Sequence, residues 1–237
     1  MNQGTYPLAA AMINQINRLD LISNNLANSN THGFKEEGLS EGSFNNYLNK
    51  AEQNNTQASK VNTVLNTIPK IDNKFINNSQ GPVTPTSNPL DFAIVKKDVF
   101  FKIRGEGGET LLTRDGAFHK LDGLLVNGSG MEVLNADGDP IATEDGFGVF
   151  VAVAKTDYTN LERIGNNTYR VLDNEKVENI EGNDDYVLQS SIEGSNVNSV
   201  HTMVSLIEAH RRFAQSQKAI ETIGEMSKSL IEKLGRG

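Results

Sequence analysis

The chain has 237 residues, no cysteine, no tryptophan and a formal net charge of −8 at pH 7. This negative balance argues against a nucleic-acid-binding protein, which usually presents a basic face. The absence of cysteine excludes disulfides, cysteine metal sites and a thiol nucleophile. No apolar run is long enough to span a bilayer, and residues 1–11 contain no Lys or Arg, which argues against a cleaved secretory signal peptide.

The N-terminal segment is predicted to form an amphipathic helix over residues 6–27. Its seam recurs at steps of three and four residues, the spacing of a heptad repeat. The residues on this seam are Ala9, Met12, Ile16, Leu19, Ser23 and Leu26. The helix is expected to stop at residues 28–33, because Asn and Gly tolerate the left-handed conformation that ends helices. Phe34 is expected to pack back on the helix end.

The middle of the chain changes character twice. Residues 36–79 are polar and read as a partly extended connector, with a possible short helix at 43–52. From residue 80 to 190 the pattern predicts an antiparallel, meander-rich β domain, because short apolar runs alternate with turn signals such as Asp122-Gly123. Strands are expected at residues 90–95, 99–104, 110–114, 117–121, 124–126, 131–134, 147–154, 168–172 and 186–189.

A short linker at residues 190–198 leads into one long helix predicted over residues 196–234, roughly 55 Å at about 1.5 Å per residue. Its apolar stripe consists of Val200, Met203, Ile207, Phe213, Ile220, Ile223, Met226, Leu230 and Leu234. The predicted fold class is α+β: long N- and C-terminal helices pair as a coiled coil, and a central antiparallel all-β domain is inserted between them. Domain boundaries are expected at residues 1–35, 36–79, 80–190 and 191–237.

Three stretches resemble the flagellar axial family of rod and hook proteins. The most specific is Leu19-Asp20-Leu21-Ile22-Ser23-Asn24-Asn25-Leu26-Ala27-Asn28, followed by Asn30-Thr31 and Gly33-Phe34-Lys35. The second is Asn88-Pro89-Leu90-Asp91-Phe92-Ala93-Ile94 with Thr113-Arg114-Asp115-Gly116-Ala117-Phe118. The third is Ser195-Asn196-Val197-Asn198, which leads into Arg211-Arg212-Phe213. Within the family the short chain most resembles the proximal rod protein, and the distal rod protein next.

The resemblance implies a structural subunit of the flagellar basal-body rod, the shaft that transmits torque from motor to hook. It implies no enzymatic activity, no cofactor, no nucleic acid and no small-molecule substrate. The expected partners are further copies of the chain, other rod and hook proteins, and the flagellar type III export apparatus, through which the chain would pass without a cleaved signal. The alternative within the family is a hook or hook-junction protein.

The expected assembly interface lies on the two terminal helices. Its candidate residues are Met12, Ile16, Leu19, Ser23, Asn24, Asn25, Leu26, Asn28, Phe34, Asn196, Val200, Met203, Ile207, Arg211, Phe213, Ile220 and Ile223. The polar triplet Ser23-Asn24-Asn25 is either solvated near a helix end or buried so that its amides fix the register between helices.

Two other interpretations stay open. Periodicity alone is also satisfied by an ordinary intramolecular helical hairpin beneath a β domain. A ligand-binding or enzymatic β domain on a helical stalk would instead require a pocket with converging titratable groups within residues 80–190. The segment from Val133 to Glu144 echoes a calcium loop but has no carboxylate at its first position, so a hairpin turn is expected there.

Overall fold

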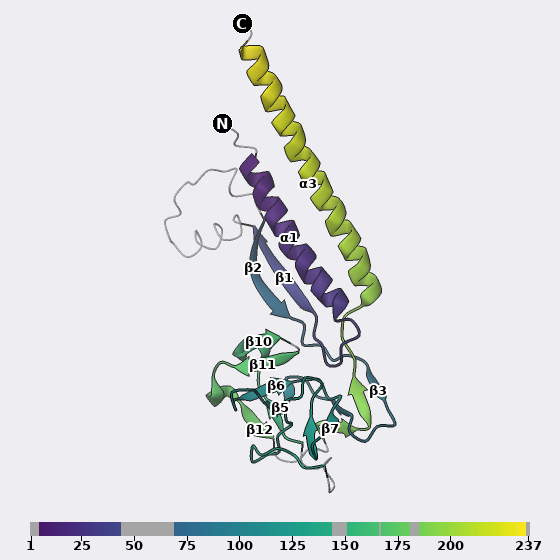
Figure 1. Cartoon of the computed structure of the whole chain (residues 1–237). Coiled ribbons are helices and arrows are strands. Elements are labelled where there is room, and N and C mark those ends of the chain that lie inside the picture. Colours follow the sequence, from purple (N-terminus) through teal and green to yellow (C-terminus); the bar gives the residue numbers. More distant parts are fainter. Residues whose placement is uncertain (1–4, 44–68, 144–150, 166, 181–184, 236–237) are drawn as a thin grey trace. The chain divides into compact units, whose positions relative to one another are not determined.

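The computed structural model describes residues 5–43, 69–143, 151–165, 167–180 and 185–235. Nearly all of the helix considered at 43–52, and the start of the strand expected at 147–154, lie outside the described residues. The chain is α+β, with an N-terminal helix, central antiparallel sheets and a C-terminal helix, as the sequence predicts (Figure 1). It divides into a helical unit, Met1–Leu26, Glu37–Phe75 and Ser199–Gly237, and a β unit, Ala27–Glu36 and Ile76–Asn198.

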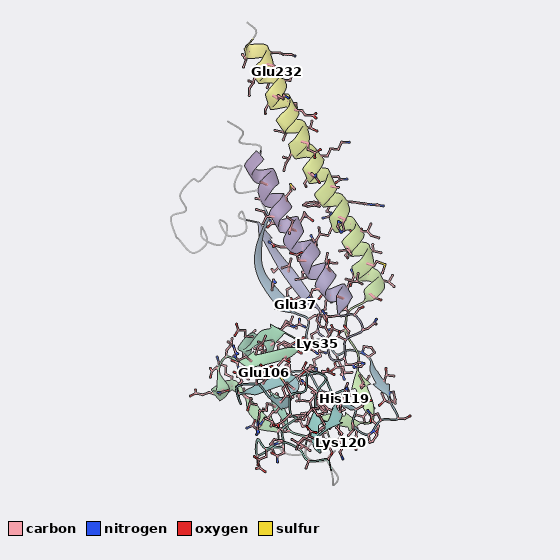
Figure 2. All side chains as sticks on the ribbon, in the orientation of Figure 1. Lys35, Glu37, Glu106, His119, Lys120 and Glu232 are labelled. Atoms are coloured by element: carbon pink, nitrogen blue, oxygen red, sulfur yellow. The ribbon has the colours of Figure 1, made fainter. Side chains whose placement is uncertain are left out.

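The helical unit contains α1 (Thr5–Ala27), α3 (Ser199–Leu234) and a two-stranded sheet of β1 (Glu37–Ser43) and β2 (Pro69–Ile76). Helices α1 and α3 lie side by side and run in opposite directions (Figure 1). Figure 2 shows side chains projecting along the whole of α3, with Glu232 near its C-terminal end. Neither helix, over its described length, is apolar enough to cross a lipid bilayer.

The β unit is built on a six-stranded antiparallel sheet in the order β10-β11-β6-β5-β9-β12. Its strands are β5 (Val99–Arg104), β6 (Thr110–Thr113), β9 (Val153–Lys155), β10 (Leu161–Gly165), β11 (Thr168–Val171) and β12 (Glu178–Ile180). The described residues of the unit also form three strand pairs: β3 (Val83–Pro85) with β14 (Ser191–Glu193), β4 (Phe92–Ile94) with β13 (Val187–Gln189), and β7 (His119–Leu121) with β8 (Leu124–Val126). Its short 3-10 helices include η3 (Tyr158–Asn160) and η4 (Asn174–Lys176).

The six-stranded sheet is covered on both faces, and β5 shows this directly. Phe101 and Ile103 pack into one apolar cluster, whereas Phe100 packs into a second. In the second cluster the Phe100 ring meets the rings of Tyr158 and Tyr169 edge to face, with centroids 5.0 and 5.8 Å apart. Because both of its faces are buried, β5 reads as a nearly continuous apolar run rather than as a strict alternation.

Most strands of the β unit lie where the sequence predicts them, including β5, β6, β7, β8, β11 and β13. The prediction of a strand at 131–134 is wrong, because residues there form only isolated bridges, such as that between Ile103 and Val133. Strands β3, β10 and β12 are not anticipated, since most of their residues are exposed and carry little apolar alternation. Strand β14 lies within the segment expected to be a linker. The hairpin turn between β7 and β8 is confirmed by positive φ angles at Asp122 and Gly123.

The turn that follows α1 requires a glycine at residue 33. Gly33 has a φ angle of +64°, and a Cβ atom at this position would overlap the carbonyl group of Arg114. The left-handed conformation and the close backbone approach both require glycine here. The predicted helix stop is confirmed, because α1 ends at Ala27, directly before residues 28–33. Phe34 follows directly, but it belongs to the β unit and is fully buried, with the Arg163 guanidinium 4.5 Å from the centre of its ring.

Candidate functional site

Hydrogen bonds inside the β unit join three segments that are far apart in the sequence. The segments are residues 33–36, 77–81 and 193–196. Backbone bonds of 2.8 Å connect the first segment to each of the other two. The side chain of Asn196 connects all three, because its Oδ1 accepts from the Glu36 N–H at 2.7 Å and its Nδ2 donates to the Asn77 carbonyl at 2.9 Å. Asn196, a candidate for the assembly interface, therefore makes its hydrogen bonds within its own chain.

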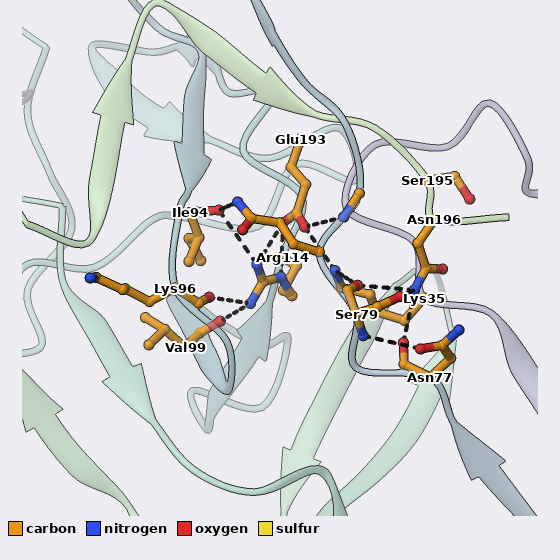
Figure 3. Close-up of polar contacts among 12 residues, drawn as sticks. Lys35, Asn77, Ser79, Ile94, Lys96, Val99, Arg114, Glu193, Ser195 and Asn196 are labelled. Atoms are coloured by element: carbon orange, nitrogen blue, oxygen red, sulfur yellow. Dashed lines mark hydrogen bonds and ion pairs between the residues drawn. The ribbon is translucent and has the colours of Figure 1, made fainter.

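Two of these segments also contribute to a buried ion cluster, in which Lys35 and Glu193 are joined by Arg114 (Figure 3). The Lys35 Nζ is 2.7 Å from Glu193 Oε1, and the nearest Arg114 nitrogen is 2.7 Å from Glu193 Oε2. All three side chains are only about 1 % exposed. Two cations therefore share one carboxylate, and the cluster keeps a net positive charge where water is excluded.

Backbone carbonyl groups stabilise the two cations of the cluster. The Arg114 Nη1 donates to the carbonyls of Lys96 and Val99 at 3.1 and 2.9 Å, which ties the guanidinium to the start of β5. The Lys35 Nζ donates to the Ser79 carbonyl at 2.8 Å. Each cation is thus bonded both to the shared carboxylate and to the main chain, which offsets part of the cost of burying charge.

The electrostatics of the cluster indicate a structural role. Burial lowers the pKa of Lys35 below its ordinary value, and the neighbouring Arg114 guanidinium lowers it further, while Glu193 opposes the shift. A ligand-binding β domain would need converging titratable groups that are free to meet a ligand. The groups that converge here are instead bonded to one another and to the backbone. Among the described residues, His, Asp and Glu form no cluster suited to holding a metal ion.

The polar triplet near the end of α1 divides into exposed and buried members. Ser23 and Asn24 are exposed, whereas Asn25 is buried. The Asn25 Nδ2 donates to the Glu37 carbonyl at 2.7 Å, and its Oδ1 accepts from the Glu37 N–H at 3.0 Å. One amide thereby pairs with the first residue of β1, so this buried amide positions a strand rather than a second helix. Asn28 accepts hydrogen bonds within the turn that ends α1.

Helix α3 presents two faces of different character. On the inner face, buried and half-buried residues recur at heptad spacing: Thr202, Leu206, Ala209, Phe213, Ser216, Ile220, Ile223 and Ser227. On the outer face, four apolar residues are 49–72 % exposed: Val200, Met203, Val204 and Ile207. At about 100° per residue, the two rows lie on roughly opposite sides of the helix.

The single stripe predicted for the C-terminal helix is therefore a mixture of these two faces. Its members Phe213, Ile220 and Ile223 belong to the inner face, whereas Val200, Met203 and Ile207 belong to the outer face and remain exposed in this chain. Arg211 is exposed on the same side as the outer face.

The seam predicted for α1 is displaced around the helix. Ile16 is 44 % exposed and Ser23 is exposed, while Met12, Leu19 and Leu26 are half-buried. The row that is buried or half-buried at heptad spacing consists of Ala11, Gln15, Arg18, Ile22 and Asn25. This row was missed because three of its five members are polar, although its steps of four and three residues match those of the predicted seam.

A small polar cavity lies between α1 and α3. It has a volume of about 60 Å³ and is lined by Gln15, Arg18, Ser205, Glu208, Ala209 and Arg212. The short Ala209 side chain leaves this gap opposite α1, and the Gln15 Oε1 is buried with no hydrogen-bond partner among the described residues. A cavity of this size and polarity has room for bridging water. The residues that line the cavity also show which turns of the two antiparallel helices face each other.

Comparisons with known proteins point to one family. Residues 6–35 match the family described as Flagella basal body rod protein, and residues 188–233 match the family described as Flagellar basal body rod FlgEFG protein C-terminal. The flagellar basal-body rod protein FlgF of Caulobacter vibrioides is 30% identical over 92% of this chain and 92% of its own length. The rod protein FlgG of Agrobacterium fabrum is 28% identical over 95% and 96%. The flagellar hook protein FlgE of Brucella abortus is 32% identical, but over only 54% of this chain and 30% of its own length.

Proposed function

This chain belongs to the flagellar basal-body rod protein family, and from that premise we propose how its two helices build the rod. The chain is a structural subunit of the flagellar basal body. We infer that copies of it associate through the helical unit with one another and with other axial proteins. The observation that carries this proposal is the outer face of α3, where four apolar side chains at helical spacing stay exposed.

The outer face has the chemistry of a helix–helix contact. Burying an apolar side chain of this size completely contributes about 1.5–3 kcal/mol. Each of the four residues on the outer face is still half exposed or more. Covering all four would therefore add several kcal/mol at about 1 kcal/mol per residue. Helices gain most of their stability from such tertiary packing. A contact of this kind repeated over many copies would give a stiff shaft without any catalytic step.

The candidate interface residues separate into two groups under this proposal. The exposed members, which include Val200, Met203, Ile207, Arg211 and Ile16, would contact neighbouring subunits directly. The buried or half-buried members, such as Phe213 and Ile220, would pair α3 with α1 as a coiled coil and hold the outer face in place. The ion cluster and Asn196 would keep the β unit rigid, which suits a part that carries torque.

Further elements of the proposal follow from the family rather than from contacts in the chain. We propose that the subunit reaches the rod through the flagellar type III export apparatus without a cleaved signal. We also propose that the subunit binds no small-molecule substrate. A rod role is favoured over a hook role because the alignments with the rod proteins FlgF and FlgG cover 92–96% of this chain and of each relative.

The Ile207→Asp substitution tests the proposal. Ile207 is half exposed, so the isolated variant should keep its fold, shown by an unchanged far-UV circular dichroism spectrum and urea midpoint. In cells the buried carboxylate should block packing, and motility and rod assembly should be lost. The matched control is Gln215→Asp, which places the same charge at an exposed polar position elsewhere on α3. Normal motility with Ile207→Asp would refute the assignment of the outer face to assembly.

A further inference from the structure

The inner face of α3 continues beyond the part of α1 that covers it. The cavity places Gln15 and Arg18 of α1 level with residues 205–212 of α3. Both helices rise about 1.5 Å per residue and run in opposite directions. Thr5 lies ten residues before Gln15 on α1. It is therefore level with a residue about ten positions further along α3, near Thr222. The last turns of α3 thus extend past the described start of α1.

These last turns carry an apolar surface that nothing in the described chain covers. Its members, here called the C-terminal patch, are Met226, Leu230, Ile231 and Leu234, which are 58–82 % exposed. Leu230 and Leu234 extend the heptad of the inner face by further steps of three and four residues after Ser227. The patch therefore continues a seam that α1 already covers, and the surface that suits it is another face of an α1-type helix.

Helix α1 has such a surface on the side turned away from α3. Ala9, Ile13 and Ile16 are all exposed and lie on one side of α1 at steps of four and three residues. This α1 patch spans roughly 10 Å along the helix, and the C-terminal patch spans roughly 12 Å at about 1.5 Å per residue. The stretch from Thr5 to Asn17 has no charged residue, so an apolar partner can cover the α1 patch without burying a charge of this stretch.

We propose that the C-terminal patch of one copy docks on the α1 patch of a second copy. The inference rests on the proposed function, because it names the surfaces through which the subunits join. The two patches are different surfaces, so the contact is head-to-tail and leaves an unused patch at each end of a growing row of copies. A head-to-tail contact extends into an open helical array when the rotation between copies does not close a ring, whereas a patch that paired with its own counterpart would stop at a dimer. The shaft of the proposed function requires the open array.

Disulfide cross-linking tests the contact directly, because the chain has no cysteine of its own. Within one copy the two positions cannot be bridged: Ile13 lies on the far side of α1, and Leu230 lies about 16 residues, or roughly 24 Å, beyond its level on α3. A disulfide needs Cα atoms about 4.4–6.8 Å apart. The chain carrying both Ile13→Cys and Leu230→Cys should therefore form a ladder of cross-linked oligomers when basal bodies are oxidised and run on a non-reducing gel.

The single-cysteine variants and a control pair show which surface binds the C-terminal patch. Ile13→Cys alone and Leu230→Cys alone should give no adduct, and the pair Ile13→Cys with Gln215→Cys should give no ladder. A dimer from Leu230→Cys alone would mean that the C-terminal patch pairs with itself, and would overturn the proposal. A double variant that stays monomeric would overturn it too. If either substitution abolishes motility, Ile16→Cys with Ile231→Cys replaces the pair and is judged by the same outcomes.

The experiment separates this inference from the proposed function. Basal bodies that contain the double variant and drive motility, yet give no ladder, would leave the rod role intact and remove only the assignment of these two patches. Absence of the unsubstituted chain from basal bodies would instead count against the rod role itself.

Discussion

Replacing single members of the ion cluster should have very unequal effects on the stability of the β unit. Glu193→Gln leaves Lys35 and Arg114 buried side by side, and the charge of the cluster rises from +1 to +2. Removing one partner of a buried ion pair typically costs about 3–5 kcal/mol. Because domains are stable by only about 5–15 kcal/mol, this variant should unfold at a much lower urea concentration.

Lys35→Met should be far milder, although the same ion pair is broken. It lowers the charge of the cluster to zero and leaves Arg114 paired with Glu193 at 2.7 Å. The Ser79 carbonyl loses the Lys35 ammonium but keeps the Asn196 amide at 3.0 Å, so no buried acceptor is stranded. Because Arg114 and Glu193 still form a paired, neutral unit, Lys35→Met leaves no uncompensated buried charge, which is the source of the large cost in other broken pairs. We therefore expect a change within about 1 kcal/mol.

Urea unfolding measures both variants in the intact chain. The chain has no tryptophan, and three of its five tyrosines, Tyr158, Tyr169 and Tyr186, belong to the β unit, so tyrosine fluorescence reports chiefly on that unit. The unfolding midpoint of Glu193→Gln should fall well below that of Lys35→Met. Equal losses in the two variants, or a larger loss in Lys35→Met, would refute the view that one carboxylate neutralises two buried cations.

Three further predictions concern the β unit. Gly33→Ala should lower the free energy of unfolding by at least about 2 kcal/mol, because it combines a positive φ angle with a backbone overlap, whereas Gly107→Ala, whose Cβ would meet no atom within 4 Å, should stay within about 0.5 kcal/mol. Tyr158→Phe should be neutral or stabilising by up to about 1 kcal/mol in thermal unfolding, since its hydroxyl is buried without a partner among the described residues; a loss above 2 kcal/mol would reveal an unseen partner. Burial lowers the pKa of Lys102 below 10.5, so the unfolded chain holds this proton more tightly and stability gains a contribution as pH rises from the lowered pKa toward 10.5. Lys102→Met should lack that rise, and an unchanged pH profile would contradict the burial argument.

The helices were predictable because their signal is local. Helix α1 was expected at residues 6–27 and runs from Thr5 to Ala27, and α3 was expected at 196–234 and runs from Ser199 to Leu234. The buried face of α1 was not predictable in the same way. Two rows on this helix have heptad spacing, and polar residues such as Gln15 and Arg18 occupy the row that faces α3. Apolar periodicity alone selected the other row.

The ion cluster could not be found from the sequence. Lys35 and Glu193 are separated by 158 residues, and Arg114 and Glu193 by 79. Each is a single charged residue with no local pattern, and only the folded β unit brings them together. Strand β12 was missed for a related reason: its three residues are largely exposed, and it exists because it pairs with β9.

Mass spectrometry of purified basal bodies, with and without the hook, tests the central claim most directly. A structural rod subunit should remain with salt- and detergent-washed basal bodies after the hook has been removed, and its copy number per particle would separate a short proximal segment from a long distal one. Loss of the chain together with the hook would contradict the rod assignment and indicate a hook or junction component. Its absence from both preparations would contradict a structural role in the flagellar axis.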